Sequence, residues 1–382
     1  MTFKERLFAL GVYVPDILLP APDVALETFS VVACDQYSSQ PDYWESAAQL
    51  AENKQSSLKM ILPEAYLKED NTKEIEQIGK TMREYLAKGA LRSIGEGFVF
   101  VRRQTTTGCR RGLIVALDLE KYDYSPASKS LIRATESTIE DRLPARVKIR
   151  KGALLELPHI MVLIDDKENT LLGAVDNEWD TLTPLYDFEL MQNAGRLEGR
   201  KVVELEKITE ALENLADKSG GLLFAMGDGN HSLASARLHW EYRKACLTAE
   251  QRVTDLARYA LVELVNLHDP ALVFEPIHRV LFNVKPDEFT VCDLANLPPL
   301  QELQPLLDKW LAANPTAAID YIHGEADARQ IANAPDRIAL ILPEFEKSTL
   351  FEIVKRDGAL VRKSFSMGEA PDKRHYLEAK LI

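Results

Sequence analysis

The stretch Gly221-Leu222-Leu223-Phe224-Ala225-Met226-Gly227-Asp228-Gly229-Asn230-His231-Ser232-Leu233-Ala234-Ser235-Ala236-Arg237 runs from apolar residues through two glycines to small residues. Leu222 to Met226 predicts a short buried strand, and Ser232 to Ala245 predicts a helix. Glycine takes positive φ readily and lets a ligand approach the main chain. The stretch therefore predicts a strand, a tight turn and a helix, in that order.

This turn is suited to a phosphate group, because the first turn of a helix offers unpaired N–H groups and the positive end of the helix dipole. The predicted ligand contacts are Gly227, Gly229, Asn230 and Ser232. Asp228 could hold Mg²⁺ or act as a base, and His231 could donate to a phosphoryl oxygen or carry a proton. An ordinary tight turn with an Asn or Ser cap has the same pattern, so both interpretations stay open.

The rest of the chain predicts an α/β (α+β) fold with mixed, largely antiparallel sheets and packed helices. Helices are expected at 43–53, 72–88, 205–217 and 300–313. The β-rich runs 97–103 and 111–117 flank Thr105-Thr106-Thr107-Gly108 and predict a hairpin. A second hairpin is expected between 159–164 and 170–175, and further strands at 317–322, 337–342 and 350–354. Asn296-Leu297-Pro298-Pro299 predicts a boundary between a main region, 1–296, and a smaller C-terminal α/β region, 297–382.

Composition narrows the class of partner. The chain has 382 residues, of which 46% are hydrophobic and 27% charged, and its formal net charge is -13. This charge argues against nucleic acid or an anionic membrane as a partner, since such binding relies on excess Lys and Arg. No signal peptide, membrane span or Cys-x-x-Cys pair is present in the pattern, so we expect a cytoplasmic protein with reduced thiols and a small-molecule ligand. The oligomeric state is not readable.

Two further groups of residues are candidate anion contacts. Arg142, Arg146 and Arg150 recur at i, i+4 and i+8, and would line one helix face if Pro144 lies in its first turn. They could receive phosphate oxygens, or they could be a solvated basic face. His278 and Arg279 end an apolar strand, where they could contact a phosphate, or where carbonyl groups could satisfy a buried arginine. The solitary histidines, His159 among them, are interpreted as structural.

The turn resembles the Asp-Gly-His-His-Arg motif of the domain of unknown function 1015 family. Three other stretches also resemble that family: Arg111 to Asp118 with Tyr122 and Tyr124, then Ile132 to Leu143, and Phe274 to Val280. The chain departs from the motif, because Asn230-His231-Ser232 stands where many members carry His-His-Arg. It also has Thr135-Glu136 where many members carry His-Glu before the threonine of the middle motif.

A shorter resemblance links the turn to the ParB-like superfamily, which includes sulfiredoxins and free serine kinases. There the glycine-histidine turn sits at a helix start over nucleotide phosphates. The resemblance implies a ParB-like phosphate-binding turn, a nucleotide or other phosphoryl donor, and serine or phosphoserine as substrate. It also implies a base for the substrate hydroxyl, for which Glu136 is the matching residue. From the residues alone, Glu136 could equally belong to a capping box.

Together these features predict an enzyme of phosphoryl transfer, of kinase or phosphatase type, that acts on a small metabolite. Glu136, Asp228 and His231 are its predicted catalytic residues. Asp228 also holds Mg²⁺, and Arg142, His278 and Arg279 neutralise ligand charge. The alternative is a non-catalytic nucleotide-binding regulatory protein of ParB-like type.

Overall fold

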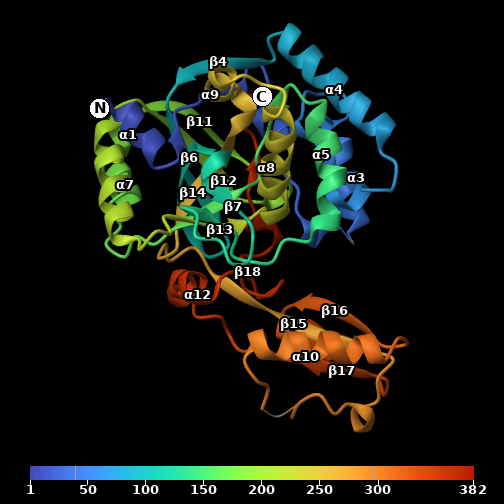
Figure 1. Cartoon of the computed structure of the whole chain (residues 1–382). Helices are drawn as coiled ribbons and strands as arrows, with labels where there is room; N and C mark the ends of the chain where they lie inside the picture. The colour runs from blue at the N-terminus through green and yellow to red at the C-terminus, as the bar shows by residue number, and fades with distance from the viewer. Residues whose placement is uncertain (39, 295) are drawn as a thin grey trace.

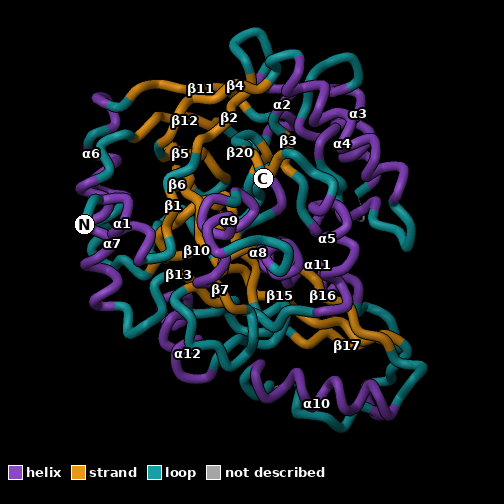
Figure 2. The backbone as a smooth tube through the Cα atoms, turned by 45° about the horizontal axis from the view of Figure 1, so that its top comes forward, coloured by secondary structure: helices purple, strands orange, loops and turns teal. Residues whose placement is uncertain are grey.

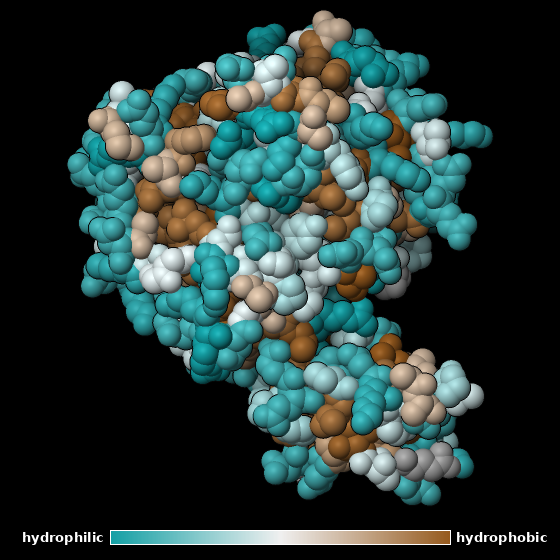
Figure 3. Space-filling model, viewed as in Figure 1, coloured by the Kyte–Doolittle hydropathy of each residue, from teal (hydrophilic) through white to brown (hydrophobic). Residues whose placement is uncertain are grey.

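The computed structural model describes residues 1–38, 40–294 and 296–382, and shows a large lobe with a smaller lobe joined to it (Figure 1). In the space-filling view the smaller lobe projects from the larger one across a narrow neck (Figure 3). The α-helices of the large lobe are α1 (Phe3–Ala9), α2 (Leu26–Phe29), α3 (Pro41–Ala51), α4 (Thr72–Ala87), α5 (Leu143–Lys151), α6 (Leu172–Asn177), α7 (Glu206–Lys218), α8 (Asn230–Lys244), α9 (Ala249–Thr254) and α12 (Leu350–Asp357).

A mixed sheet forms the centre of the large lobe, with the order β11-β12-β5-β6-β14-β10-β13-β8-β7 and β1 beside β6. Its strands are β1 (Val12–Tyr13), β5 (Phe98–Thr105), β6 (Gly108–Asp118), β7 (Tyr122–Asp123), β8 (Ile132–Arg133), β10 (Met161–Ile164), β11 (Thr183–Glu189), β12 (Arg196–Val202), β13 (Phe224–Asp228) and β14 (Tyr259–Asn266). The β10–β14, β13–β8 and β7–β8 pairs are parallel and the others antiparallel. This mixed α/β architecture confirms the predicted fold class.

Helices cover both faces of the sheet because its strands bury alternate side chains on each face (Figure 2). On β5, Phe98 and Phe100 pack in one core cluster with residues of α1, α6, α7 and α8. Val99 and Val101 pack in a second cluster with residues of α3 and α4. Small two-stranded sheets complete the lobe: β2 (Asp16–Pro20) with β4 (Leu91–Glu96), β3 (Val31–Val32) with β19 (His375–Tyr376), and β9 (Leu155–Glu156) with β20 (Lys380–Leu381).

The smaller lobe is built on β15 (Phe274–Phe282), which leaves the large lobe and pairs with β16 (Ala318–His323) and β17 (Arg337–Leu340). Helices α10 (Leu300–Ala313) and α11 (Glu325–Ile331) belong to this lobe, whose core includes Leu281, Leu303 and Leu340. The chain then returns to the large lobe, where β18 (Phe365–Met367) pairs with the start of β15. The division between 1–296 and 297–382 stays a prediction.

Two predicted elements are wrong. Residues 170–175 do not pair with 159–164, because Leu171, Leu172 and Val175 are buried at helical spacing around α6. Instead, β10 takes β13 and β14 as neighbours. The predicted strand 350–354 is the start of α12, which buries Leu350, Phe351 and Val354. Short apolar runs fit either period, and their burial in the fold decides between helix and strand.

Candidate functional site

The predicted strand, turn and helix are present as β13, the turn at Gly229 and α8. Gly229 has φ 84° and is the N-cap of α8. A Cβ there would lie 3.1 Å from Ile160 Cγ1 and 3.2 Å from Ile160 Cα, so both conformation and space favour glycine. Because glycine has no capping side chain, the first-turn N–H groups of α8 are left for other acceptors.

The second glycine of the turn has a different role. Gly227 is not among the glycines with positive φ. A Cβ there would lie 2.6 Å from Met367 Cε and 3.1 Å from Leu163 Cγ. Gly227 therefore lets β18 pack against the end of β13.

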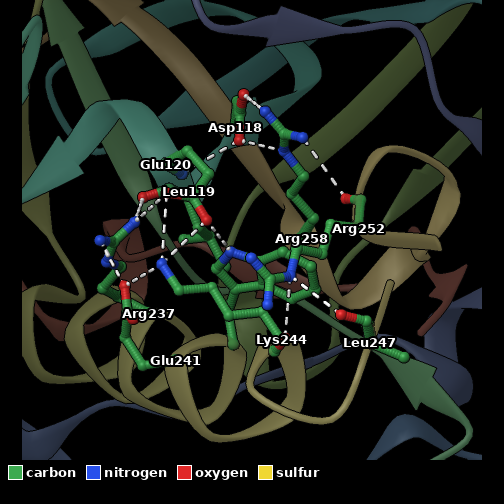
Figure 4. Close-up of polar contacts among 10 residues, drawn as sticks. Asp118, Leu119, Glu120, Arg237, Glu241, Lys244, Leu247, Arg252 and Arg258 are labelled. Carbon is green, nitrogen blue, oxygen red and sulfur yellow. Dashed lines mark hydrogen bonds and ion pairs between the residues drawn. The ribbon is translucent and has the colours of Figure 1, made fainter. Parts of the chain in front are cut away.

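Polar contacts join α8 to the turn that follows β6 (Figure 4). The Trp240 indole N–H donates to Glu120 at 2.6 Å, and Lys244 Nζ lies 3.0 Å from the same carboxylate. Beside them, Arg258 forms a two-pronged ion pair with the buried Asp118, with N–O distances of 2.8 and 2.7 Å. The Glu120 contacts hold the C-terminal half of α8 against the turn that follows β6.

The turn opens on a cavity of about 400 Å³. All predicted residues of the turn line it, together with Glu136 and Arg142: Gly227, Asp228, Gly229, Asn230, His231 and Ser232. The C-terminal part of the chain contributes Lys363, Lys373 and Tyr376, and the smaller lobe contributes Tyr321 and His323. The structure thus brings most of the predicted site residues to one cavity.

Asp228 is already engaged by two groups. Its Oδ1 accepts the N–H of Gly229 at 2.9 Å, and its Oδ2 lies 3.4 Å from Lys373 Nζ. Among the described residues, no group of three or more His, Cys, Asp and Glu side chains could hold a metal ion. Asp228 therefore does not fit a resident Mg²⁺ site by itself, since the ion would replace an ammonium partner and would need most of its ligands from elsewhere.

His231 is a neutral hydrogen-bond acceptor. The backbone N–H of Ile139 donates to His231 Nε2 at 3.3 Å, so the ring proton lies on Nδ1. Burial, followed by the positive charges of Arg146 and Arg142, lowers the pKa of His231 to about 4. The side chain thus ties the first turn of α8 to the segment after Glu136, and Nε2 is not free to take a proton.

Glu136 lines the cavity and holds the C-terminal loop. Its Oε1 accepts the N–H of Ser364 at 3.0 Å and its Oε2 accepts the N–H of Lys363 at 3.2 Å. Burial raises the pKa of Glu136 above its ordinary value, although these N–H groups and the Lys363 ammonium act against the rise. A carboxylate with a raised pKa in a cavity is a suitable general base.

The three arginines of the stripe line the cavity. Pro144 lies in the first turn of α5, so Arg146 and Arg150 are on this helix and Arg142 is the residue that precedes it. Each has an acidic partner. Arg146 lies 2.9 Å and Arg142 3.9 Å from Glu64, and Arg150 pairs with Glu156. A bound anion would therefore share these cations with carboxylates.

His278 and Arg279 lie outside this cavity. His278 accepts the N–H of Leu342 at 3.1 Å and lines a separate pocket between β15 and α11. Arg279 is fully buried, where Nε donates to Gln304 at 3.1 Å and Nη2 to the Arg362 carbonyl at 3.3 Å. Of the two interpretations of Arg279, a phosphate contact or a buried arginine satisfied by carbonyl groups, the second describes these contacts.

The cavity also contains residues that the sequence analysis did not assign to the site, among them His159, Lys363, Lys373 and Tyr376. His159 is not an isolated histidine, because its ring contacts both Ser232 and Tyr376. Lys363 lies 2.6 Å from Asp35, and this ion pair joins the C-terminal loop to the segment after β3. The pairings of β18 with β15 and of β19 with β3 bring the tail here, and no local pattern encodes such long-range pairings.

A family model described as "Protein of unknown function (DUF1015)" matches residues 17–296. The chain belongs to this family. The match confirms the resemblance inferred from the four motifs, and it includes the turn and Glu136. No curated protein was found to match the chain.

The solved structures that resemble this chain include a mutant free serine kinase in complex with ADP, at 10% identity and a TM-score of 0.36, covering 70% of this chain and 91% of that one. A conserved hypothetical protein from Pyrococcus furiosus has 9% identity and a TM-score of 0.34, covering 69% and 93%. A free serine kinase in complex with AMP has 10% identity and a TM-score of 0.34, covering 70% and 90%.

The described part of the chain contains no helix that is both long and apolar enough to cross a membrane.

Proposed function

We propose that the cavity binds a phosphorylated small molecule with its phosphate at the N-terminus of α8, and that the protein transfers the phosphoryl group to or from a hydroxyl. The observation that carries this proposal is the meeting of two features in one cavity. An uncapped helix start at Gly229 faces the same space as Glu136, a carboxylate with a raised pKa.

The N–H groups of Asn230, His231 and Ser232 hold the phosphate in this proposal, and the dipole of α8 favours its negative charge. The Lys373 and Lys363 ammonium groups add positive charge from the C-terminal part of the chain. The amide oxygen of Asn230 is buried and has no hydrogen-bond partner among the described residues, so it is available to a donor on the ligand.

In this proposal Glu136 takes the proton of an acceptor hydroxyl. Its two oxygens each accept one backbone N–H, and a carboxylate oxygen can accept a second hydrogen bond. Phosphoryl transfer depends chiefly on positioning and on neutralising charge, which the helix start and the two lysines supply. Mg²⁺ enters this site only together with a phosphorylated ligand, since Asp228 alone does not make a metal site.

A thermal-shift screen tests the proposal. The ligands are ADP, ATP, CTP, pyrophosphate and phosphoserine, each with and without Mg²⁺, and phosphoserine tests the substrate that the family resemblance suggests. A ligand that binds only the folded protein raises the melting temperature by mass action. If the protein turns over the ligand that stabilises it, the result supports the proposal that it is an enzyme. Binding of a ligand without its turnover would favour the alternative, a nucleotide-binding regulator. If none of the ligands binds, both the enzyme and the regulator are contradicted.

A further inference from the structure

A chain of hydrogen bonds runs through the wall of the cavity from the first turn of α8 to the C-terminal tail. Ser232 Oγ lies 3.0 Å from His159 Nε2, and His159 Nδ1 lies 2.6 Å from the Tyr376 hydroxyl. All three residues line the cavity. They come from three separate parts of the fold: α8, the segment before β10, and β19.

We propose that Ser232 is a nucleophile, that His159 is its base, and that Tyr376 orients His159. A hydroxyl within hydrogen-bond reach of an imidazole, whose other nitrogen is held by a third group, is the arrangement that activates a serine. The Tyr376 oxygen accepts the proton on Nδ1, which leaves the Nε2 lone pair for the proton of Ser232.

The surroundings of His159 suit a base. Burial lowers the pKa of His159, so the ring is neutral near neutral pH and can take a proton. The ring of Tyr376 lies 5.2 Å from the imidazole at an angle of 35°, and Tyr376 is held in β19 by its pairing with Val31. Both contacts restrict the imidazole to the orientation that faces Ser232.

The step that follows rests on the phosphate site proposed above. Ser232 Oγ attacks the phosphorus of a phosphoryl donor, the Oγ–P bond forms, and the bond from phosphorus to the leaving oxygen breaks. The proton of Oγ passes to His159 Nε2 and then to the leaving oxygen. In the second step an acceptor hydroxyl gives its proton to Glu136 and attacks the phosphorus, and the Oγ–P bond breaks. Oγ then takes a proton from water, and Glu136 releases its own proton to water, which restores both groups.

Ser235 provides a matched control on the same helix. It lies one turn further along α8 and also lines the cavity. Its Oγ donates to the carbonyl oxygen of His231 at 2.6 Å instead of to an imidazole, so it is not activated.

The test uses diisopropyl fluorophosphate, which reports an activated serine without a known natural donor. Oγ displaces fluoride from phosphorus, and mass spectrometry of the intact protein and of its peptides locates the new group. We expect one group, on Ser232. Ser232→Ala should take none, and Ser235→Ala should react as the unaltered protein does. His159→Gln should slow labelling by roughly 10²-fold or more. Tyr376→Phe should slow it less, because the base remains but loses its orienting partner.

An unlabelled but folded protein, or equal labelling of His159→Gln, would overturn the inference. If His159→Gln does not fold, Tyr376→Phe decides in its place, and labelling of this variant at the unaltered rate would overturn the inference. Failure here is distinct from failure of the proposed function. If pyrophosphate raises the melting temperature but Ser232 is not labelled, the phosphate site is supported and the role of Ser232 as nucleophile is contradicted. If Ser232 is labelled but pyrophosphate does not raise the melting temperature, the nucleophile is supported and the phosphate site is contradicted.

Discussion

Lys373 Nζ lies 3.4 Å from Asp228 Oδ2, so the C-terminal tail of the chain supplies a cation to the end of β13. Lys373 is almost fully buried and also donates to Ser366 Oγ at 3.0 Å. In family members that carry Asp-Gly-His-His-Arg, an arginine follows the histidines, and here that position is Ser232. Lys373 thus puts positive charge beside a turn that has no arginine at this position.

Lys373→Met should weaken binding of pyrophosphate by roughly 10-fold or more, because a hydrogen bond to a charged group contributes about 1.5–3 kcal/mol. Calorimetric titration measures the change. Lys355→Met is the matched control, since Lys355 lies on α12 and pairs with Glu352 away from the cavity. If the two variants bind pyrophosphate with equal affinity, Lys373 does not contribute to the phosphate site.

Glu136→Gln should lower turnover by roughly 10²- to 10⁴-fold while ligand binding persists, because the amide cannot take the proton of a hydroxyl. The variant should also lose about 1–3 kcal/mol of stability, since one backbone N–H of the 363–364 segment would face an amide N–H₂ group. Steady-state rates and urea unfolding measure the two effects. Glu140→Gln, at an exposed position nearby, should change neither. Full activity of Glu136→Gln would contradict its role as base.

Gly229→Ala should destabilise the protein by about 1–3 kcal/mol, because alanine at φ 84° is strained and its Cβ would press on Ile160. Gly152→Ala is the control: Gly152 ends α5 at φ -102°, and a Cβ there meets nothing within 4 Å. Urea unfolding of both variants measures the difference. Similar stabilities would mean that the turn can relax, and would weaken the structural account of Gly229.

Stability should fall as the pH drops from about 6.5 towards about 4, the window between the pKa of an unfolded histidine and that of folded His231. In this window the unfolded chain binds the proton that the folded protein excludes. His239, His323 and His375, with pKa values of about 4, act in the same direction. His231→Gln should therefore show a shallower fall between about pH 7 and about pH 5 in urea unfolding. A slope identical to that of the unaltered protein would contradict the burial of a neutral His231.

Elements with long, regular patterns could be predicted from the sequence. The hairpin of β5 and β6 followed from two β-rich runs around Thr105 to Gly108, and α4 and α10 followed from helical spacing. Short apolar runs were ambiguous: 171–175 and 350–354 are helical because the fold buries one side of each.

The site was predictable in part for a similar reason. The turn, Glu136 and the stripe on α5 belong to local motifs, and they meet in one cavity. Lys363, Lys373 and Tyr376 reach the cavity through the return of the chain from the smaller lobe, and such long-range pairing leaves no local pattern. His159 gains its role only from this return, since its ring contacts Tyr376. Arg279 belongs to a stretch that resembles the family, but it is buried in the smaller lobe and does not line the cavity. A local motif therefore did not show where its side chain would lie.

The most direct test of the phosphate site is a crystal structure of the protein grown with pyrophosphate. The account predicts phosphate oxygens about 2.7–3.2 Å from the backbone nitrogens of Asn230, His231 or Ser232, with Lys373 beside them. Pyrophosphate bound elsewhere, with the first turn of α8 facing only solvent, would contradict it.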